Sequence, residues 1–95
     1  MAAYIVFTRE KMRDQVGFDA YSALAGASMA GHTFKPHVVY GAVEMLEGAP
    51  IEGAVVVEFP TMEAARAWYD SPAYREAREH RFKSADYRVF ITEGL

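Results

Sequence analysis

Three short apolar runs constrain the fold of this chain more than any other feature. They are "AYIVFT" (3–8), "AVVVEF" (54–59) and "YRVFIT" (87–92), and each is rich in β-branched and aromatic residues. Runs of this length and composition predict buried β-strands. A fourth strand is predicted over 34–46, where proline near the start indicates an edge position and a later glycine invites a bulge.

The segment between the first two strands predicts an amphipathic helix. Asp14 is a suitable N-cap, and Gly31 stands where a left-handed residue commonly ends a helix. Apolar residues recur there at intervals of three and four, at Val16, Phe18, Tyr21, Leu24, Ala25 and Met29. This spacing places one apolar stripe along the helix.

The segment "TMEAARAWYDSPAYREAREHR" (61–81) has helical periodicity with an interruption in the middle. Thr61 is a natural N-cap for the first part. Ser71 precedes proline and is therefore disfavoured in a helix, whereas Pro72 suits the first position of a new one. We interpret "DSP" as a capped break between two helices, not as a catalytic loop.

The resulting order is β-α-β-β-α-β, which predicts one ferredoxin-like α+β domain over residues 1–95 with an antiparallel four-stranded sheet. Its helices should cover one face of the sheet only. The other face should then be polar, yet the run 54–59 is apolar on both sides except for Glu58. The same face of a second copy would cover it at a standard interface of ~800 Å² per partner, so we predict a homodimer.

Composition excludes several classes of function. The formal net charge is −3 and no basic stripe is present, which argues against nucleic acid as a partner. The absence of cysteine excludes disulfides and thiolate chemistry. The apolar run near the N-terminus is too short for a signal peptide or a membrane span, so we expect a cytoplasmic protein without a membrane partner.

The segments "VVVEFPTMEAARAWYDSPAYREAREHR", "GAVEMLEG" and the final "ITEGL" resemble the small bacterial proteins called domain of unknown function 1330. The resemblance covers nearly the whole chain and is most specific over 53–95. It implies a dimeric α+β barrel, in which two ferredoxin-like sheets face one another. Members often carry an arginine and two glycines where this chain has Val39, Tyr40 and Gly41, so a ligand that depends on that arginine would differ here.

The candidate catalytic residues are Tyr40, His37 and Glu58. His37 is either a general base or a solvated histidine at a sheet edge, and Tyr40 is a candidate phenol donor. Three positions apart on a strand, these two should point to opposite faces unless a bulge intervenes. Glu58 is either a structural partner of Arg66, Arg81 or Arg88, or a carboxylate in a pocket.

The candidate ligand-binding residues lie around the helix break. Trp68, Tyr69 and Tyr74 would wall an aromatic pocket or simply belong to the core, and Arg81 continues the same helical spacing. His32 is interpreted as a residue at a helix terminus and His80 as solvated. The histidines lack the spacing of metal ligands, so we predict neither a metal nor a cofactor.

Three hypotheses for function follow. Similarly built proteins include cofactor-free monooxygenases, lactone isomerases and polyketide-processing enzymes, so the first is a cofactor-free enzyme of monooxygenase, isomerase or cyclase type. Its substrate would be a small aromatic or polyketide-like acid or ketone bound between helices and sheet. The second is a non-catalytic module that binds a small ligand, and the third is a structural dimerisation domain. The sequence leaves open whether the protein is an enzyme.

Overall fold

Four strands and three helices follow one another in the predicted order. The computed structural model describes every residue from 1 to 95. Its elements are β1 (Ala3–Met12), α1 (Gln15–Ser28), β2 (Lys35–Val39), β3 (Gly53–Phe59), α2 (Met62–Tyr69), α3 (Pro72–Ser84) and β4 (Ala85–Glu93). The strands form one sheet in the order β2-β3-β1-β4, with every neighbouring pair antiparallel. This topology confirms the ferredoxin-like prediction.

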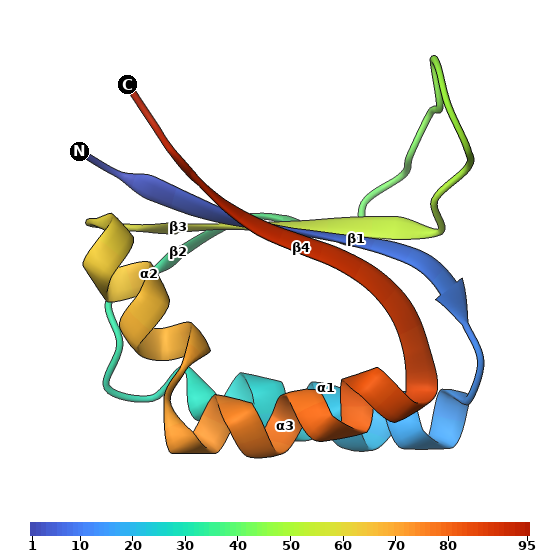
Figure 1. Cartoon of the computed structure of the whole chain (residues 1–95), viewed down its shortest axis with the longest axis horizontal. Helices are drawn as coiled ribbons and strands as arrows, with labels where there is room; N and C mark the ends of the chain where they lie inside the picture. The colour runs from blue at the N-terminus through green and yellow to red at the C-terminus, as the bar shows by residue number, and fades with distance from the viewer.

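All three helices lie on one side of the sheet (Figure 1). α1 and α3 run side by side beneath it, and α2 connects the sheet to α3 at one end. The core fills the space between the two layers, and its largest fully buried side chains include Ile5, Phe59 and Tyr74. We call this side of the sheet the helix-covered face and the other side the open face.

The interruption between α2 and α3 is the capped break that the sequence predicts. The Thr61 hydroxyl accepts a hydrogen bond from the Ala64 N–H at 3.0 Å, which caps α2. The Ser71 hydroxyl accepts from the Tyr74 N–H at 3.3 Å, and Pro72 begins α3. These caps satisfy N–H groups that have no partner within the helices, so the chain changes direction at little cost.

The prediction of a strand over 34–46 is wrong for most of that range. β2 ends at Val39, and Tyr40 takes the left-handed backbone conformation with φ of 54°. This turn directs the chain away from the sheet, and residues 41–51 make no backbone hydrogen bond. They form a projecting loop with Leu46 at 86% exposure.

The apolar stripe predicted for α1 also needs correction, because Val16 is 81% exposed and lies outside the core.

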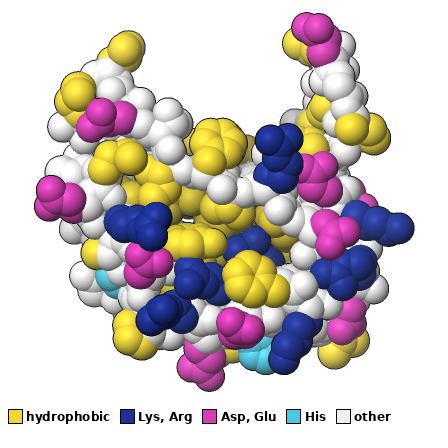
Figure 2. Space-filling view, viewed as in Figure 1, with side chains coloured by type: hydrophobic (Ala, Val, Ile, Leu, Met, Phe, Trp, Pro, Cys, Tyr) yellow, Lys and Arg dark blue, Asp and Glu magenta, His cyan; other side chains and the backbone are white.

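The open face is bordered by projecting segments at both ends. The chain termini rise at one end and the 40–52 loop rises at the other, both away from the helices (Figure 1). Figure 2, in the same orientation, shows them as two projections with the sheet between them. Alternation along the strands places Val6, Val56 and Phe90 on this open face. Its centre is therefore apolar, as the sequence predicts.

Candidate functional site

A cavity of about 280 Å³ that opens to solvent on one side, which we call the interior cavity, lies between α1 and the helix-covered face of the sheet. Most of its wall is apolar, and the side chains that line it include Phe7, Val55 and Val57 from the sheet, Tyr21 and Met29 from α1, and Trp68 from α2. Tyr40, which follows the last residue of β2, also lines the cavity and adds a phenol hydroxyl to its wall. A concave apolar space with a few polar groups is typical of a small-molecule site.

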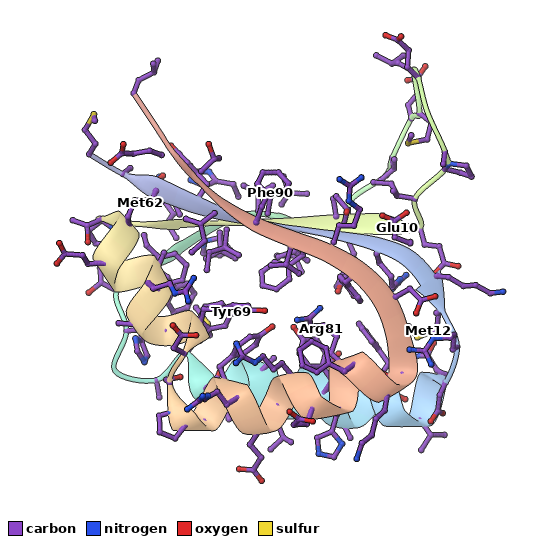
Figure 3. The ribbon with its side chains drawn as sticks, in the orientation of Figure 1. Glu10, Met12, Met62, Tyr69, Arg81 and Phe90 are labelled. Carbon is purple, nitrogen blue, oxygen red and sulfur yellow. The ribbon has the colours of Figure 1, made fainter.

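A second hollow, which we call the edge groove, lies between α2 and the edge strand β4 and measures about 520 Å³. α2 contributes Met62, Glu63, Arg66 and Tyr69, and β4 contributes Val89, Phe90 and Ile91. Figure 3 labels Met62 and Tyr69 on α2 and Phe90 on β4. The groove exists because no further strand pairs with β4 on this side of the sheet.

Two pairs of phenols lie between the helices and the sheet. The hydroxyls of Tyr21 and Tyr74 are hydrogen-bonded at 2.8 Å, and those of Tyr40 and Tyr87 at 2.5 Å. Burial is the main cause that raises the pKa of Tyr21, Tyr74 and Tyr87 above the ordinary 10.0. These three phenols are therefore neutral at physiological pH and serve as hydrogen-bonding groups, not as bases.

The structure brings the four predicted ligand-binding residues together. The Trp68 and Tyr74 ring centroids are 4.1 Å apart, and those of Tyr69 and Tyr74 are 5.4 Å apart. Arg81 Nη2 lies 3.5 Å from the Tyr69 hydroxyl. Figure 3 shows Tyr69 and Arg81 extending from different helices into the space under the sheet. Trp68 lines the interior cavity and Tyr69 lines the edge groove, so this cluster stands between the two hollows.

The structure brings two of the predicted catalytic residues, His37 and Glu58, together and separates Tyr40 from them. His37 Nε2 and Glu58 Oε1 are 2.6 Å apart on the open face, where the His37 ring also lies near Tyr4. Tyr40 faces the helices instead, with its ring near Phe18 and its hydroxyl on Tyr87. Strand alternation predicts this opposition, which persists despite a register shift between Pro36 and Val38. Glu58 therefore pairs with His37. It does not pair with Arg66, Arg81 or Arg88, the three arginines that the sequence suggests.

Sequence reasoning did not single out Tyr21 or Tyr87 for the site. Tyr21 reaches it from α1 and Tyr87 from β4, in each case across more than 40 residues of chain from its phenol partner. The only signal in the sequence is their position in the apolar pattern of a helix and a strand. That pattern assigns them to the core without indicating which hydroxyls meet.

The chain contains no cluster of three or more His, Cys, Asp or Glu side chains arranged to hold a metal ion. None of its helices combines the length and apolar character that a bilayer crossing requires. Apart from Glu63 in the edge groove, the polar groups of the helix–sheet region are phenols, hydroxyls, the Trp68 indole N–H and guanidinium groups. They can donate hydrogen bonds and stabilise negative charge.

Fold and hollows together define a small α+β protein of ferredoxin-like fold, with a mostly apolar site between its helices and its sheet. Over residues 2–95 the chain matches the model of the family described as domain of unknown function (DUF1330), and it belongs to that family. The resemblance seen in the sequence is thereby confirmed. A search of curated proteins finds no match.

Solved structures share the fold at low sequence identity. A protein of unknown function from Rhodopseudomonas palustris has a TM-score of 0.77 and 18% identity, over 99% of this chain and 82% of that one. A dimeric protein of unknown function with a ferredoxin-like fold from Bacteroides fragilis has a TM-score of 0.68 and 14% identity. The match covers 98% of this chain and 96% of that one. SnoaB, a cofactor-independent oxygenase from Streptomyces nogalater, has a TM-score of 0.61 and 11% identity. The match covers 99% of this chain and 91% of that one. At these identities the likeness shows the fold.

Proposed function

We propose that this protein is a homodimer that binds a small, largely apolar organic molecule between its helices and its sheet. The interior cavity carries this proposal, because it is a concave apolar space bordered by a few hydroxyl groups. The edge groove provides a second hollow next to the same aromatic cluster. We call the two hollows and the cluster of Trp68, Tyr69, Tyr74 and Arg81 between them the helix–sheet site.

The open face supports the proposal of a dimer. Val6 and Val56 are paired neighbours at its centre, and the nearby Phe90 is 52% exposed. The projecting loop adds further exposed apolar groups, Val43, Met45 and Leu46. A second copy would remove this surface from water, and the Bacteroides fragilis protein of similar fold is described as dimeric.

The chemistry available in the interior cavity favours binding and charge stabilisation over proton abstraction. No carboxylate or imidazole lines that cavity, and the neighbouring phenols have raised pKa values. Such a site would stabilise negative charge that develops on the ligand itself. This is compatible with the cofactor-free reactions of oxygenase, isomerase or cyclase type, for which the fold of SnoaB is an analogy.

Tyr40 remains proposed as a catalytic phenol donor, and its place in the wall of the interior cavity supports that role. His37 and Glu58 remain proposed for proton transfer, but on the open face, where a second copy would enclose them. No step in the interior is assigned to them. His37→Ala is therefore a useful control for ligand binding, since its side chain points away from the cavity.

A thermal-shift screen of small aromatic acids, ketones and polyketide-like compounds tests the binding proposal. We expect hits to raise the Tm with concentration and to change the fluorescence of Trp68, the single tryptophan, which lies in the cavity wall. Tyr40→Phe should weaken these hits, and His37→Ala should leave them unchanged. If no compound raises the Tm, the ligand-binding proposal fails and a purely structural role is favoured.

Light scattering during gel filtration tests the assembly. The proposal requires a mass of twice the 10.6 kDa of one chain at micromolar concentration. A stable monomer under those conditions would refute the dimer.

A further inference from the structure

We propose that Arg81 is the anion-binding group of the helix–sheet site, and that the ligand is a flat, mostly apolar monoanion whose carboxylate pairs with this guanidinium. The inference rests on the proposed function, because it concerns the same site. It names the chemical class of the ligand, which the apolar hollows alone do not define.

The Arg81 side chain is buried without a matching negative charge. The residue is only 3% exposed, and its buried Nε has no hydrogen-bond partner. Its side-chain hydrogen bonds go to neutral phenols. Nη2 makes a long contact of 3.5 Å with the Tyr69 hydroxyl, and a hydrogen bond from Arg81 partly offsets the effect of burial on the pKa of Tyr74. A guanidinium has five N–H donors and stays charged in proteins, so an isolated buried one is strongly unfavourable. An anion is the partner that this arrangement lacks.

Four other arginines of the chain have a carboxylate within ion-pair distance. Arg9, also on the helix-covered side, lies 3.2 Å from a Glu52 oxygen. Arg13 pairs with Asp86 at 2.9 Å, and Arg66 pairs with Asp70 at 2.8 Å. Arg81 has no carboxylate within ion-pair distance, although it is the most buried arginine. Arg75 and Arg88 have no such carboxylate either, but both are exposed to water. Arg81 is therefore the one buried arginine without an ion pair.

Aromatic rings surround the guanidinium but do not neutralise it. The rings of Phe7, Tyr21, Phe82 and Tyr87 have their centroids 5.1–5.9 Å from Arg81 Cζ. Such contacts attract a cation weakly and carry no net charge. Since burial raises the pKa of Tyr21, Tyr74 and Tyr87, these phenols also stay neutral and cannot act as the counter-ion.

The surroundings of Arg81 also indicate the shape and the charge of the ligand. Phe7 and Tyr21 belong to the wall of the interior cavity, and Tyr69 belongs to the wall of the edge groove. If the carboxylate of a ligand accepted hydrogen bonds from the guanidinium in place of the Tyr69 hydroxyl, the apolar part of that ligand would lie between aromatic rings. One unmatched positive charge calls for one negative charge, and a planar carboxylate matches the guanidinium in a bidentate pair.

The test compares ligands of equal shape and different charge by isothermal titration calorimetry. The probes are 4-tert-butylbenzoate, 2-naphthoate and 3-phenylpropanoate, each measured beside its own carboxamide. We expect at least one carboxylate to bind wild-type protein roughly tenfold or more tightly than its carboxamide, because a hydrogen-bonded charge pair is lost in the amide. Arg81→Met should abolish the preference. Arg75→Met, an exposed arginine of α3, should retain it.

The apo proteins provide a second readout. Because Arg81→Met removes a buried charge without a partner, its Tm without ligand should equal or exceed that of wild type. A marked fall in Tm, together with equal binding of carboxylates and carboxamides to wild type, would make Arg81 a structural residue and overturn the inference. Equal binding of both series alone also refutes the anion site, while the proposed function survives. If no member of either series binds, this inference fails, and the thermal-shift screen decides separately whether the proposed function survives.

Discussion

The two faces of the sheet are built from the same strands and differ in how they are covered. On the helix-covered face, Ile5 and Val57 are buried by the chain's own helices. On the open face, the adjacent Val6 and Val56 remain half-buried and have no layer above them. Alternation therefore creates two apolar faces, but the chain has helices for only one.

The polar groups of the two faces differ as well. The helix-covered face has the buried Tyr21–Tyr74 pair and the buried Arg81, together with the more accessible Tyr40–Tyr87 pair. The open face has the His37–Glu58 hydrogen bond among half-exposed side chains. The comparison suggests that the first face is completed by a small ligand and the second by another copy of the chain. Three predictions test this distinction.

The largest effect is expected from a charge at the centre of the open face. Val56→Asp would place one unpaired carboxylate per subunit in the proposed interface, which should weaken the dimer by roughly 6 kcal/mol, at about 3 kcal/mol for each buried charge. Sedimentation velocity over a range of concentrations should show a monomer. Val16→Asp adds the same charge at an exposed site on α1 and should remain dimeric. Retention of the dimer by Val56→Asp would place the interface elsewhere.

The next largest effect should separate the faces by chain stability. Phe59→Ala removes a fully buried ring from the helix-covered face and should lower the free energy of unfolding by about 3–5 kcal/mol. Phe90→Ala, on the open face, should cost less than about 1 kcal/mol when the chain is monomeric. Urea denaturation in the Val56→Asp background measures both changes without a contribution from dimerisation. Similar costs for the two substitutions would contradict the distinction.

The smallest effect is the share of a single phenol in a pH dependence that belongs to the helix-covered face. Folding raises the pKa of Tyr21, Tyr74 and Tyr87 above 10.0, so near and above that pH the unfolded chain releases these protons more readily than the folded chain. The stabilisation is fully present well below pH 10.0. Above that pH the free energy of unfolding should fall, by up to about 1.4 kcal/mol per pH unit from the buried Tyr21, with Tyr74 and Tyr87 acting in the same direction.

Urea denaturation between about pH 9 and about pH 11 measures this slope. Tyr21→Phe should reduce the slope of the free energy of unfolding against pH by the contribution of one phenol. An unchanged slope in that variant would show that Tyr21 titrates normally in the folded protein.

Local signals in the sequence were sufficient for most of the fold. Thr61, Ser71 and Pro72 act on their immediate neighbours, so their roles as caps and helix start follow from residue type. The end of β2 was not predictable in this way. Tyr40 is a bulky residue in a left-handed conformation, which sequence rules assign to glycine, and tertiary packing of its ring outweighs that preference.

The candidate site was predictable only where its residues lie close together in the chain. Trp68, Tyr69 and Tyr74 flank one helix break, so helical geometry brings them together. The contacts of Tyr21 with Tyr74 and of Tyr40 with Tyr87 depend on how α1 and the sheet are packed. Periodicity shows which face of an element is buried, but not which side chains meet there.

The left-handed turn at Tyr40 also links two positions that lie 13 places apart in the chain. A methyl group added at Gly53 would stand 2.7 Å from Cδ1 of the Tyr40 ring, closer than packed carbon atoms approach. The aromatic residue at 40 thus requires glycine at 53. Homologous chains with a small side chain at the first position should be free to vary at the second. An alignment of such chains should therefore show these two columns changing together, and a paired exchange could alter which molecules the cavity admits.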